Sequence, residues 1–355
     1  MKVKLGDIFE IGSGGTPSKS HPEYYKGNIP WVKTGDLKSE YLYEVEDFIS
    51  EEGLKNSSAK MYEENTVLIA MYGATIGATS ILKLSACTNQ ACAAFKENEK
   101  VIPEYLYYFL RSQKERFVKD GVGGAQPNIS AGYLKKVEME IPLLENQKEI
   151  IGILDKTSEI ISRMDQEIRL LDNLIKARFV EMFGDKGYPV LKWKDVFNTT
   201  TGKLDSNAAV EDGEYPFFTC SKEALRIDKF AYDQEALLLA GNNAAGKYDV
   251  KYYKGKFNAY QRTYILDLKE SWSYQLFRYQ LEDKLAYLQQ QSLGGLTKYL
   301  TMKILGKLEF IVPPIDKQME FEQFVYQVDK SKVAVQKALD ETKLLFDSLM
   351  QKYFG

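Results

Sequence analysis

Three segments of this 355-residue sequence have residue types that could bind an anion or a nucleic acid. The first, Gly241-Asn-Asn-Ala-Ala-Gly-Lys247, fits the first seven positions of a phosphate-binding P-loop. Position 248 is Tyr, however, where a P-loop needs Ser or Thr to hold magnesium. The next residues have a strand-like pattern, whereas phosphate binding needs a helix N-terminus at that place. A strand–turn–strand connection is the favoured interpretation, and a nucleotide-binding enzyme is the alternative.

The second segment is a glycine-rich stretch near the N-terminus, Gly12-Ser-Gly-Gly-Thr-Pro17. It lacks the spacing of a dinucleotide-binding loop, and Pro22 shortly after it disfavours a following helix. Two interpretations stay open. The stretch is either a flexible turn, or a loop whose backbone amides, together with Ser18 and Lys19, meet a phosphate.

The third segment, Lys247 to Arg262, is basic and aromatic. It holds five cations and one acid, interleaved with five aromatic residues. Cations neutralise phosphates, and Asn258, Gln261 and Arg262 can hydrogen-bond the edges of bases. The alternative is the exposed edge of a sheet, protected from aggregation by its lysines.

Composition argues against metal or histidine-based catalysis. The single histidine, His21, cannot form a two-histidine metal site, and Cys87, Cys92 and Cys220 are too scattered for a zinc site or a disulfide framework. The longest aliphatic run, residues 236–240, is far shorter than the roughly 20 residues that span a bilayer. We therefore expect a soluble, cytoplasmic, non-catalytic protein without a membrane partner. The net charge of −3 leaves only local basic clusters for nucleic-acid binding.

The chain contains an internal repeat, because short matches recur in the same order in both halves. Residues 3–9 match 191–197, residues 62–70 match 232–240, and residues 134–138 match 305–309. Both halves also end in Phe-Gly. Thr88-Asn-Gln-Ala91 stands where the second half has its basic segment, and it carries fewer charges. Two repeats that share a scaffold but differ in their polar loops suggest two domains that recognise different nucleic-acid sequences.

Each half ends in a proline-free segment with heptad spacing, which predicts a long helix. The expected seam positions, four and three residues apart, are Ile150, Leu154, Thr157, Ile161, Met164, Ile168, Leu171, Ile175, Arg178 and Met182, then Phe321, Val325, Val328, Lys332, Val335, Leu339, Thr342, Phe346, Leu349 and Tyr353. Two such helices, roughly 50–60 Å long, can bury each other as an antiparallel coiled coil. The alternative is an ordinary amphipathic helix packed on its own domain.

The remaining parts read as two homologous α+β domains. Residues 66–70, 236–240 and 264–268 are short apolar runs bounded by Gly, Asn and Asp, which is typical of strands. Residues 104–116 and 273–290 have a helical pattern. We expect recognition domains at 1–142 and 185–314, and spacer helices at 143–184 and 315–355.

Taken together, these residues resemble the specificity (S) subunits of type I restriction-modification systems, over the whole chain. Members of this family often have Glu-Gln where each long helix begins. Here the pairs are Asn146-Gln147 and Lys317-Gln318, so only the Gln is kept. The second half also lacks the Thr-Pro of the family's opening block and has Thr200 to Asp205 there. The matching blocks are Gly12 to Ser18, Tyr24 to Leu37, Gly73 to Gly77, Thr88 to Gln90, Leu134 to Pro142, Gly294 to Lys298, and Val312 to Pro314.

The resemblance implies a DNA-binding subunit with two target-recognition domains, pseudo-twofold related and separated by the helices. Such a protein would bind double-stranded DNA at a bipartite, asymmetric site, and the helices would set the unread gap. It would recruit two modification (methyltransferase) subunits and the restriction subunits. It would bind no cofactor itself, because S-adenosylmethionine, ATP and magnesium belong to those partners. A coiled-coil scaffold without a role at DNA is the rival interpretation.

The expected DNA-contacting residues are polar side chains in or near these blocks. In the first domain they are Ser18, Lys19, Tyr24, Lys33, Thr34, Tyr72, Asn89, Gln90, Gln126 and Asn128. In the second domain they are Lys222, Asn242, Asn243, Lys247, Tyr260, Gln261, Arg262, Lys298 and Tyr299.

Overall fold

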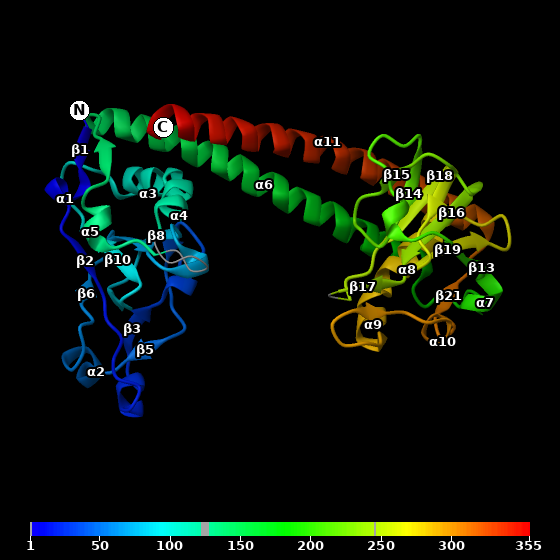
Figure 1. The fold of residues 1–355 in the computed structure, drawn as a ribbon, viewed down its shortest axis with the longest axis horizontal. Coiled ribbons are helices and arrows are strands. Elements are labelled where there is room, and N and C mark those ends of the chain that lie inside the picture. The colour runs from blue at the N-terminus through cyan, green and yellow to red at the C-terminus, as the bar shows by residue number, and fades with distance from the viewer. Residues whose placement is uncertain (1, 122–127, 245) are drawn as a thin grey trace. The chain divides into compact units, whose positions relative to one another are not determined.

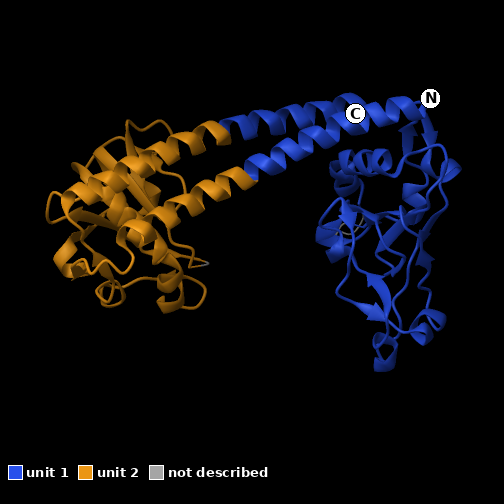
Figure 2. Ribbon diagram, turned by 180° about the vertical axis from the view of Figure 1, so that it is seen from behind, with its two compact units in different colours: residues 1–165, 337–355 blue, residues 166–336 orange. Residues whose placement is uncertain are grey.

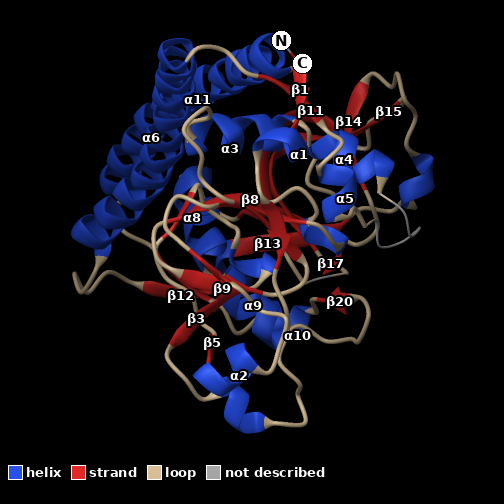
Figure 3. Ribbon diagram, turned by 90° about the vertical axis from the view of Figure 1, so that its left-hand side faces the viewer, coloured by secondary structure: helices blue, strands red, loops and turns tan. Residues whose placement is uncertain are grey.

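The chain forms two compact units, each built from strands and helices (Figures 2 and 3). Unit 1 comprises residues 1–165 and 337–355, and unit 2 comprises residues 166–336. The computed structural model describes residues 2–121, 128–244 and 246–355. The α+β class with a repeated domain is confirmed, whereas the domain boundaries at 142, 184 and 314 stay a prediction.

Unit 1 contains a five-stranded sheet in the order β2-β10-β7-β8-β4, a four-stranded sheet in the order β5-β3-β9-β6, and the pair β1-β11 (Figure 1). The strands are β1 (Lys2–Lys4), β2 (Ile11–Ser13), β3 (Ile29–Val32), β4 (Tyr41–Leu42), β5 (Phe48–Ile49), β6 (Met61–Tyr62), β7 (Val67–Ala70), β8 (Thr79–Leu82), β9 (Ala86–Thr88), β10 (Cys92–Phe95) and β11 (Glu138–Glu140). The short helices are α1 (Leu5–Ile8), η1 (Pro22–Tyr25), η2 (Thr34–Asp36), α2 (Glu51–Lys55), η3 (Gly73–Thr75), α3 (Pro103–Ser112), α4 (Lys114–Asp120) and α5 (Ala131–Leu134).

Unit 2 contains a six-stranded sheet in the order β13-β19-β16-β18-β14-β15 and the pairs β12-β21 and β17-β20. The strands are β12 (Val190–Lys192), β13 (Phe197–Thr201), β14 (Tyr215–Phe218), β15 (Leu225–Ile227), β16 (Tyr232–Ala240), β17 (Asn242–Asn243), β18 (Val250–Ala259), β19 (Thr263–Leu268), β20 (Lys298–Tyr299) and β21 (Glu309–Ile311). The short helices are α7 (Trp193–Val196), η4 (Ser206–Ala208), α8 (Tyr274–Asp283), α9 (Leu285–Gln291) and α10 (Met302–Leu305).

The two units repeat one strand arrangement. The order β2-β10-β7-β8 in unit 1 corresponds to β13-β19-β16-β18 in unit 2, and β1-β11 corresponds to β12-β21. The matching stretches 62–70 and 232–240 differ in one respect. Residues 232–240 form the continuous strand β16, whereas the first stretch is interrupted before β7 at Asn65, which has φ of 64°. Asn tolerates this left-handed conformation better than most residues, so it allows a turn there.

The helical pattern at 104–116 and 273–290 is confirmed, and each stretch forms two consecutive helices. Helices α3 and α4 are separated at Gln113, and α8 and α9 are separated at Lys284. Both residues have φ near −87° and ψ near zero, at φ/ψ −86°/1° and −87°/−3°. Neither is Gly or Pro, so the break has no local sequence signal.

Two forty-residue helices, α6 (Leu144–Phe183) and α11 (Ile315–Phe354), carry the expected heptad seams. Every expected seam position is buried or half-buried, while most residues between them are exposed. In unit 1 the start of α6 shares a core with the end of α11, through Leu154, Met350 and Phe354. In unit 2 the ion pair between Arg178 and Glu320 (2.7 Å) joins the other ends. The antiparallel coiled coil is thus favoured over helices packed only on their own domains.

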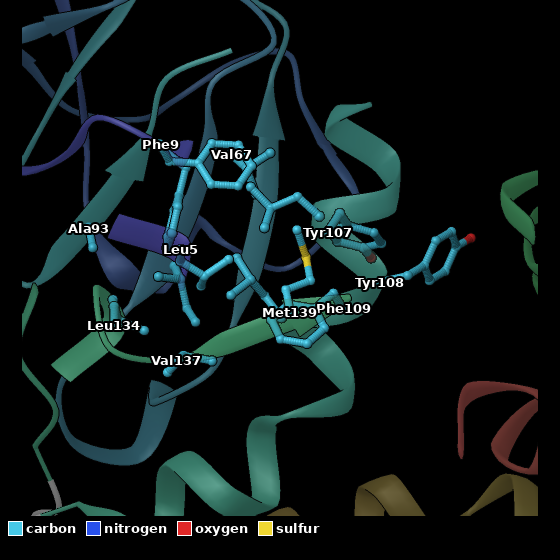
Figure 4. Packing of buried hydrophobic residues seen from close by; sticks show 14 of the residues in the cluster. Leu5, Phe9, Val67, Ala93, Tyr107, Tyr108, Phe109, Leu134, Val137 and Met139 are labelled. Atoms are coloured by element: carbon cyan, nitrogen blue, oxygen red, sulfur yellow. The ribbon is translucent and has the colours of Figure 1, made fainter. Parts of the chain in front are cut away.

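No helix within the described ranges is both long and apolar enough to cross a membrane. Each unit has its own core of buried apolar residues. Figure 4 shows the cluster of unit 1, where Leu5 and Phe9 of the first repeat block lie among strand and helix side chains. Their repeat counterparts, Trp193 and Phe197, are equally buried in unit 2.

Candidate nucleic-acid interface

In unit 2, five chain segments meet beyond the ends of the central strands. Four backbone hydrogen bonds hold them. Gly241 N–H donates to the Arg262 carbonyl (2.8 Å), Leu300 N–H to the Gly241 carbonyl (2.8 Å), Tyr260 N–H to the Phe218 carbonyl (2.9 Å), and Gln261 N–H to the Leu204 carbonyl (2.9 Å). We name this arrangement loop cluster 2. It consists of residues 202–205, 218–221, 241–243, 260–263 and 298–300.

Unit 1 contains the same arrangement, held by equivalent bonds. Met71 N–H donates to the Ala91 carbonyl (2.8 Å), Ile129 N–H to the Met71 carbonyl (3.0 Å), and Asn89 N–H to the Val32 carbonyl (2.9 Å). A backbone bridge between Tyr72 and Asn128 takes the place of the β17-β20 pair. We name residues 14–16, 32–34, 71–72, 88–91 and 128–129 loop cluster 1.

Glycine is required where the opening loop crosses its neighbour. A Cβ on Gly14 would lie 1.9 Å from the Thr88 carbonyl oxygen, and a Cβ on Gly202 would lie 2.0 Å from the Ala259 carbonyl oxygen. The N–H of Gly15 already donates to Thr88 (2.9 Å). The Gly15 amide is therefore not free to bind a phosphate, and the glycines permit a close approach of the two backbones; phosphate binding by the rest of this loop stays a prediction.

Most of the expected DNA-contacting residues come together in the two clusters, and their roles at DNA stay a prediction. Cluster 1 contains Lys33, Thr34, Tyr72, Asn89, Gln90 and Asn128, and cluster 2 contains Asn242, Asn243, Tyr260, Gln261, Arg262, Lys298 and Tyr299. Lys222 directly follows cluster 2, and the N–H of Lys247 donates to Asn243 Oδ1 (3.3 Å). Gln126 lies outside the described residues.

Ser18, Lys19 and Tyr24 lie outside the residue ranges of cluster 1. The Ser18 hydroxyl bonds that of Ser20 (2.7 Å), and the Tyr24 ring stacks on His21 with centroids 4.7 Å apart. The Tyr24 carbonyl accepts a hydrogen bond from Ser50 beside α2 (2.9 Å). Tyr24 therefore belongs to the η1–α2 side of unit 1, whereas Ser18 and Lys19 are exposed and follow the first segment of cluster 1 closely in the chain.

In the basic segment 247–262, only Asn258 and Ala259 pair with β14, so the lysine-bearing part of β18 before them is a sheet edge and that alternative stays open. Its strand β18 pairs with β16 on one side and with β14 on the other. Two of its lysines are neutralised, Lys251 by Asp249 (2.7 Å) and Lys254 by Glu235 (3.0 Å). Among the residues that the structure describes, Arg262 has no acidic partner, and its side chain is exposed. Lys247, Lys256 and Arg262 have no ion-pair partner among the described residues, so they carry the free charge of this segment, and Lys256 lies over the Phe230 ring (4.7 Å to the centroid).

Two other expectations for this region are resolved. Asn258 was expected at base edges, but its side chain is buried and its Nδ2 donates to the Lys229 carbonyl (2.9 Å), so the base-contact interpretation was wrong. The P-loop-like stretch continues into strands β17 and β18, and no helix follows it in the described part of the segment. The strand–turn–strand interpretation is confirmed.

Each cluster borders a hollow in the surface of its unit. The hollow in unit 2 has a volume of about 330 Å³ and is lined by Asn242, Asn243 and Tyr260, together with Ser206, Thr219, Ser221 and Thr297. The last four were missed from the sequence, because short hydroxyl residues in a loop have no distinctive spacing. They add donors and acceptors of the kind that read base edges.

The hollow in unit 1 has about 380 Å³ and a different lining, with Tyr72, Asn128, Asp120 and Tyr133. The Tyr133 hydroxyl donates to Asp120 (2.6 Å), which lowers the pKa of that carboxyl, helped by Arg116. Asp120 is therefore an ionised acceptor at neutral pH. Lys33, in contrast, forms an ion pair with Asp47. The hydrogen bond to Asp47 raises the pKa of the Lys33 ammonium, and the carboxylate neutralises its charge.

A sequence model of the type I restriction modification DNA specificity domain matches residues 1–171 and again residues 185–342. The chain belongs to this family of DNA specificity proteins, with two copies of the domain. The resemblance inferred from the motifs is thus confirmed, and the function is that of a type I specificity subunit and not of a scaffold without a role at DNA.

Named relatives agree with this assignment. The type I restriction enzyme MjaIX specificity subunit of Methanocaldococcus jannaschii is 25% identical, over 98% of this chain and 91% of that protein. The EcoprrI specificity subunit of Escherichia coli is 22% identical over 89% and 84%. The crystal structure of an S subunit from M. genitalium shares the fold, with a TM-score of 0.62 at 16% identity, over 100% of this chain and 96% of that one.

Proposed function

We propose that this chain reads a bipartite, asymmetric DNA site, with loop cluster 1 contacting one part and loop cluster 2 the other. The observation that carries the proposal is the repeated five-segment cluster, built by equivalent backbone bonds but lined by different side chains. Base edges in the major groove differ in their donors and acceptors, so different linings select different bases. Two unlike clusters on one chain therefore predict two unlike half-sites.

The chain would supply specificity without catalysis. S-adenosylmethionine, ATP and magnesium would be held by two modification subunits and by restriction subunits, which dock on the helices and adjacent surfaces. Two modification subunits require two equivalent docking surfaces, and the repeat provides them. Phosphate contacts fix position, whereas base contacts select sequence, so rigid helices and polar loops suit this division of labour.

Selection from random DNA tests the proposal. The complete complex with its modification subunits is incubated with a random duplex library, and the retained molecules are sequenced. We expect two short conserved parts separated by a fixed number of unconserved base pairs. One contiguous motif, or no enrichment, would contradict the proposal.

Replacing Arg262 with Ala is expected to relax one half-site only. The exposed guanidinium lies in cluster 2, and a bidentate arginine–guanine contact contributes about 1–3 kcal/mol of discrimination. Its repeat counterpart in cluster 1 is Ala91, so the other half-site should keep its selectivity. Competition binding of the complex to duplexes with single base changes measures the effect.

Lys254→Ala is the matched control for Arg262→Ala, because Lys254 belongs to the same segment but is paired with Glu235. It should leave selectivity unchanged at every position. An equal loss of affinity for all sequences in Arg262→Ala would instead identify Arg262 as a phosphate contact.

The chain without its partners is expected to bind DNA weakly. Its net charge is −3 and several of its lysines are ion-paired, whereas duplex binding depends mainly on neutralised phosphates. We expect affinity at least about a hundredfold below that of the complex with modification subunits, and a smaller salt dependence. Fluorescence anisotropy over a salt series measures both, and tight, sequence-selective binding by the isolated chain would refute this expectation.

A further inference from the structure

Two buried glutamines occupy equivalent places at the starts of the long helices. Gln147 is the fourth residue of α6 and Gln318 is the fourth residue of α11, and their exposed fractions are 0% and 1%. The preceding residues, Asn146 and Lys317, are exposed. Burying an amide is unfavourable unless its polar atoms are hydrogen-bonded, so the contacts of these side chains indicate what they are for.

In unit 1, the Gln147 amide joins three backbone positions. Its Oε1 accepts from the N–H of Ile102 (2.9 Å), and its Nε2 donates to the carbonyls of Lys100 (2.9 Å) and Pro142 (3.0 Å). Ile102 is the N-cap of α3, and Pro142 lies between β11 and α6. One side chain therefore connects the first turn of the long helix to the start of the domain helix and to the end of the last strand.

In unit 2, Gln318 makes the equivalent joint. Its Oε1 accepts from the N–H of Ser273 (3.0 Å), and its Nε2 donates to the carbonyl of Pro313 (2.7 Å). Ser273 is the N-cap of α8, the repeat counterpart of α3. The same connection is thus built twice, although the neighbouring side chains differ.

We propose that Gln147 and Gln318 are positioning residues that fix the orientation of each recognition domain on its long helix, and thereby fix the number of unread base pairs between the half-sites. This inference rests on the proposed bipartite reading. The bonds join backbone to backbone through one amide, so they define the path of the chain at the joint. Other contacts keep each domain attached, such as Tyr108 to Asp155 (2.7 Å) in unit 1 and Ser273 Oγ to Glu322 (2.5 Å) in unit 2. Without the glutamine, the domain stays bound but its orientation is less restricted.

The test uses the complete complex with Gln147→Met or Gln318→Met, which keep side-chain length and remove the hydrogen bonds. Adenine methylation rates are measured on duplexes with both cognate half-sites and the selected gap, or a gap one base pair longer or shorter. We expect the preference for the selected gap to fall by about tenfold, because several hydrogen bonds that restrict the joint are lost while the domain stays attached. Selectivity for the bases within each half-site should stay unchanged.

Controls separate positioning from folding. Asn146→Ala and Asp316→Ala change exposed residues of the same turns and should keep the wild-type gap preference. An unchanged preference in the glutamine variants, or an equal loss of rate on all gaps, would overturn the inference. If Gln147→Met or Gln318→Met does not assemble, Gln147→Glu or Gln318→Glu takes its place. These replacements keep the acceptor and lose the donor, and the same two outcomes decide. A wild-type complex that methylates no split site would instead overturn the proposed function itself.

Discussion

Gly202→Ala is expected to destroy reading of one half-site while the other is read normally. The added Cβ would lie 2.0 Å from the carbonyl oxygen of Ala259 and 2.4 Å from that of Tyr260. Both are backbone atoms, so the strand itself must shift, at a cost of about 3 kcal/mol. Because Tyr260 belongs to loop cluster 2, the shift displaces the residues that are proposed to contact bases. Thermal unfolding should show a decrease in Tm of roughly 6–12 °C for unit 2.

Gly14→Ala is the matching variant in unit 1, with a Cβ 1.9 Å from the Thr88 carbonyl. It should abolish reading of the opposite half-site. Gly295→Ala and Gly152→Ala are controls, since a Cβ at either position meets nothing within 4 Å. Binding of the complex to duplexes with one scrambled half-site is the measurement. If Gly14→Ala and Gly202→Ala affected the same half-site, the assignment of one cluster to each part would be wrong.

Leu174→Lys and Leu345→Lys should each remove one modification subunit from the complex. The two leucines are equivalent in the repeat, and both are exposed on the long helices, by 46% and 53%. Two copies of one partner are expected to use equivalent surfaces, and a charge in a central apolar contact costs about 2 kcal/mol or more. Leu174 lies in unit 2 and Leu345 in unit 1, so the double variant should bind neither subunit.

Mass measurement of the purified complexes gives the stoichiometry directly. Val333→Lys is the control: Val333 is 70% exposed on the same helix as Leu345, but its repeat counterpart is the polar Ser162. It should leave two modification subunits bound. Exposed positions tolerate lysine with little change in stability, so a lost subunit would not reflect unfolding. Retention of both subunits in the double variant would contradict docking at these positions.

The repeat and the long helices were predictable because burial leaves a periodic signal. The first match, residues 3–9 against 191–197, places Leu5 and Trp193 in equivalent cores, together with Phe9 and Phe197. The heptad seams follow the same logic, since an apolar residue every three or four positions marks one helix face. Such patterns are local, so one sequence suffices to see them.

The details of the site were not predictable in this way, because they depend on contacts between distant residues. Nothing in the sequence shows that Lys33 is neutralised by Asp47 or Lys254 by Glu235. The hydroxyls of Thr219 and Ser221 join the hollow of unit 2 only through folding. The helix break at Gln113 leaves no signal in the sequence either, since glutamine has no unusual backbone preference. The sequence therefore predicts the segments that meet in the clusters, but not which of their charged side chains are ion-paired.

The most direct test of the central claim is a methylation map of host DNA. The chain is co-expressed with candidate modification subunits, and modified adenines are located by single-molecule sequencing. We predict methylation of a split motif that appears only when this chain is present, and a change in only one half of that motif when residues 185–314 are replaced by those of a relative. A stable complex that methylates no adenine, or a motif in which both halves change together, would contradict the account.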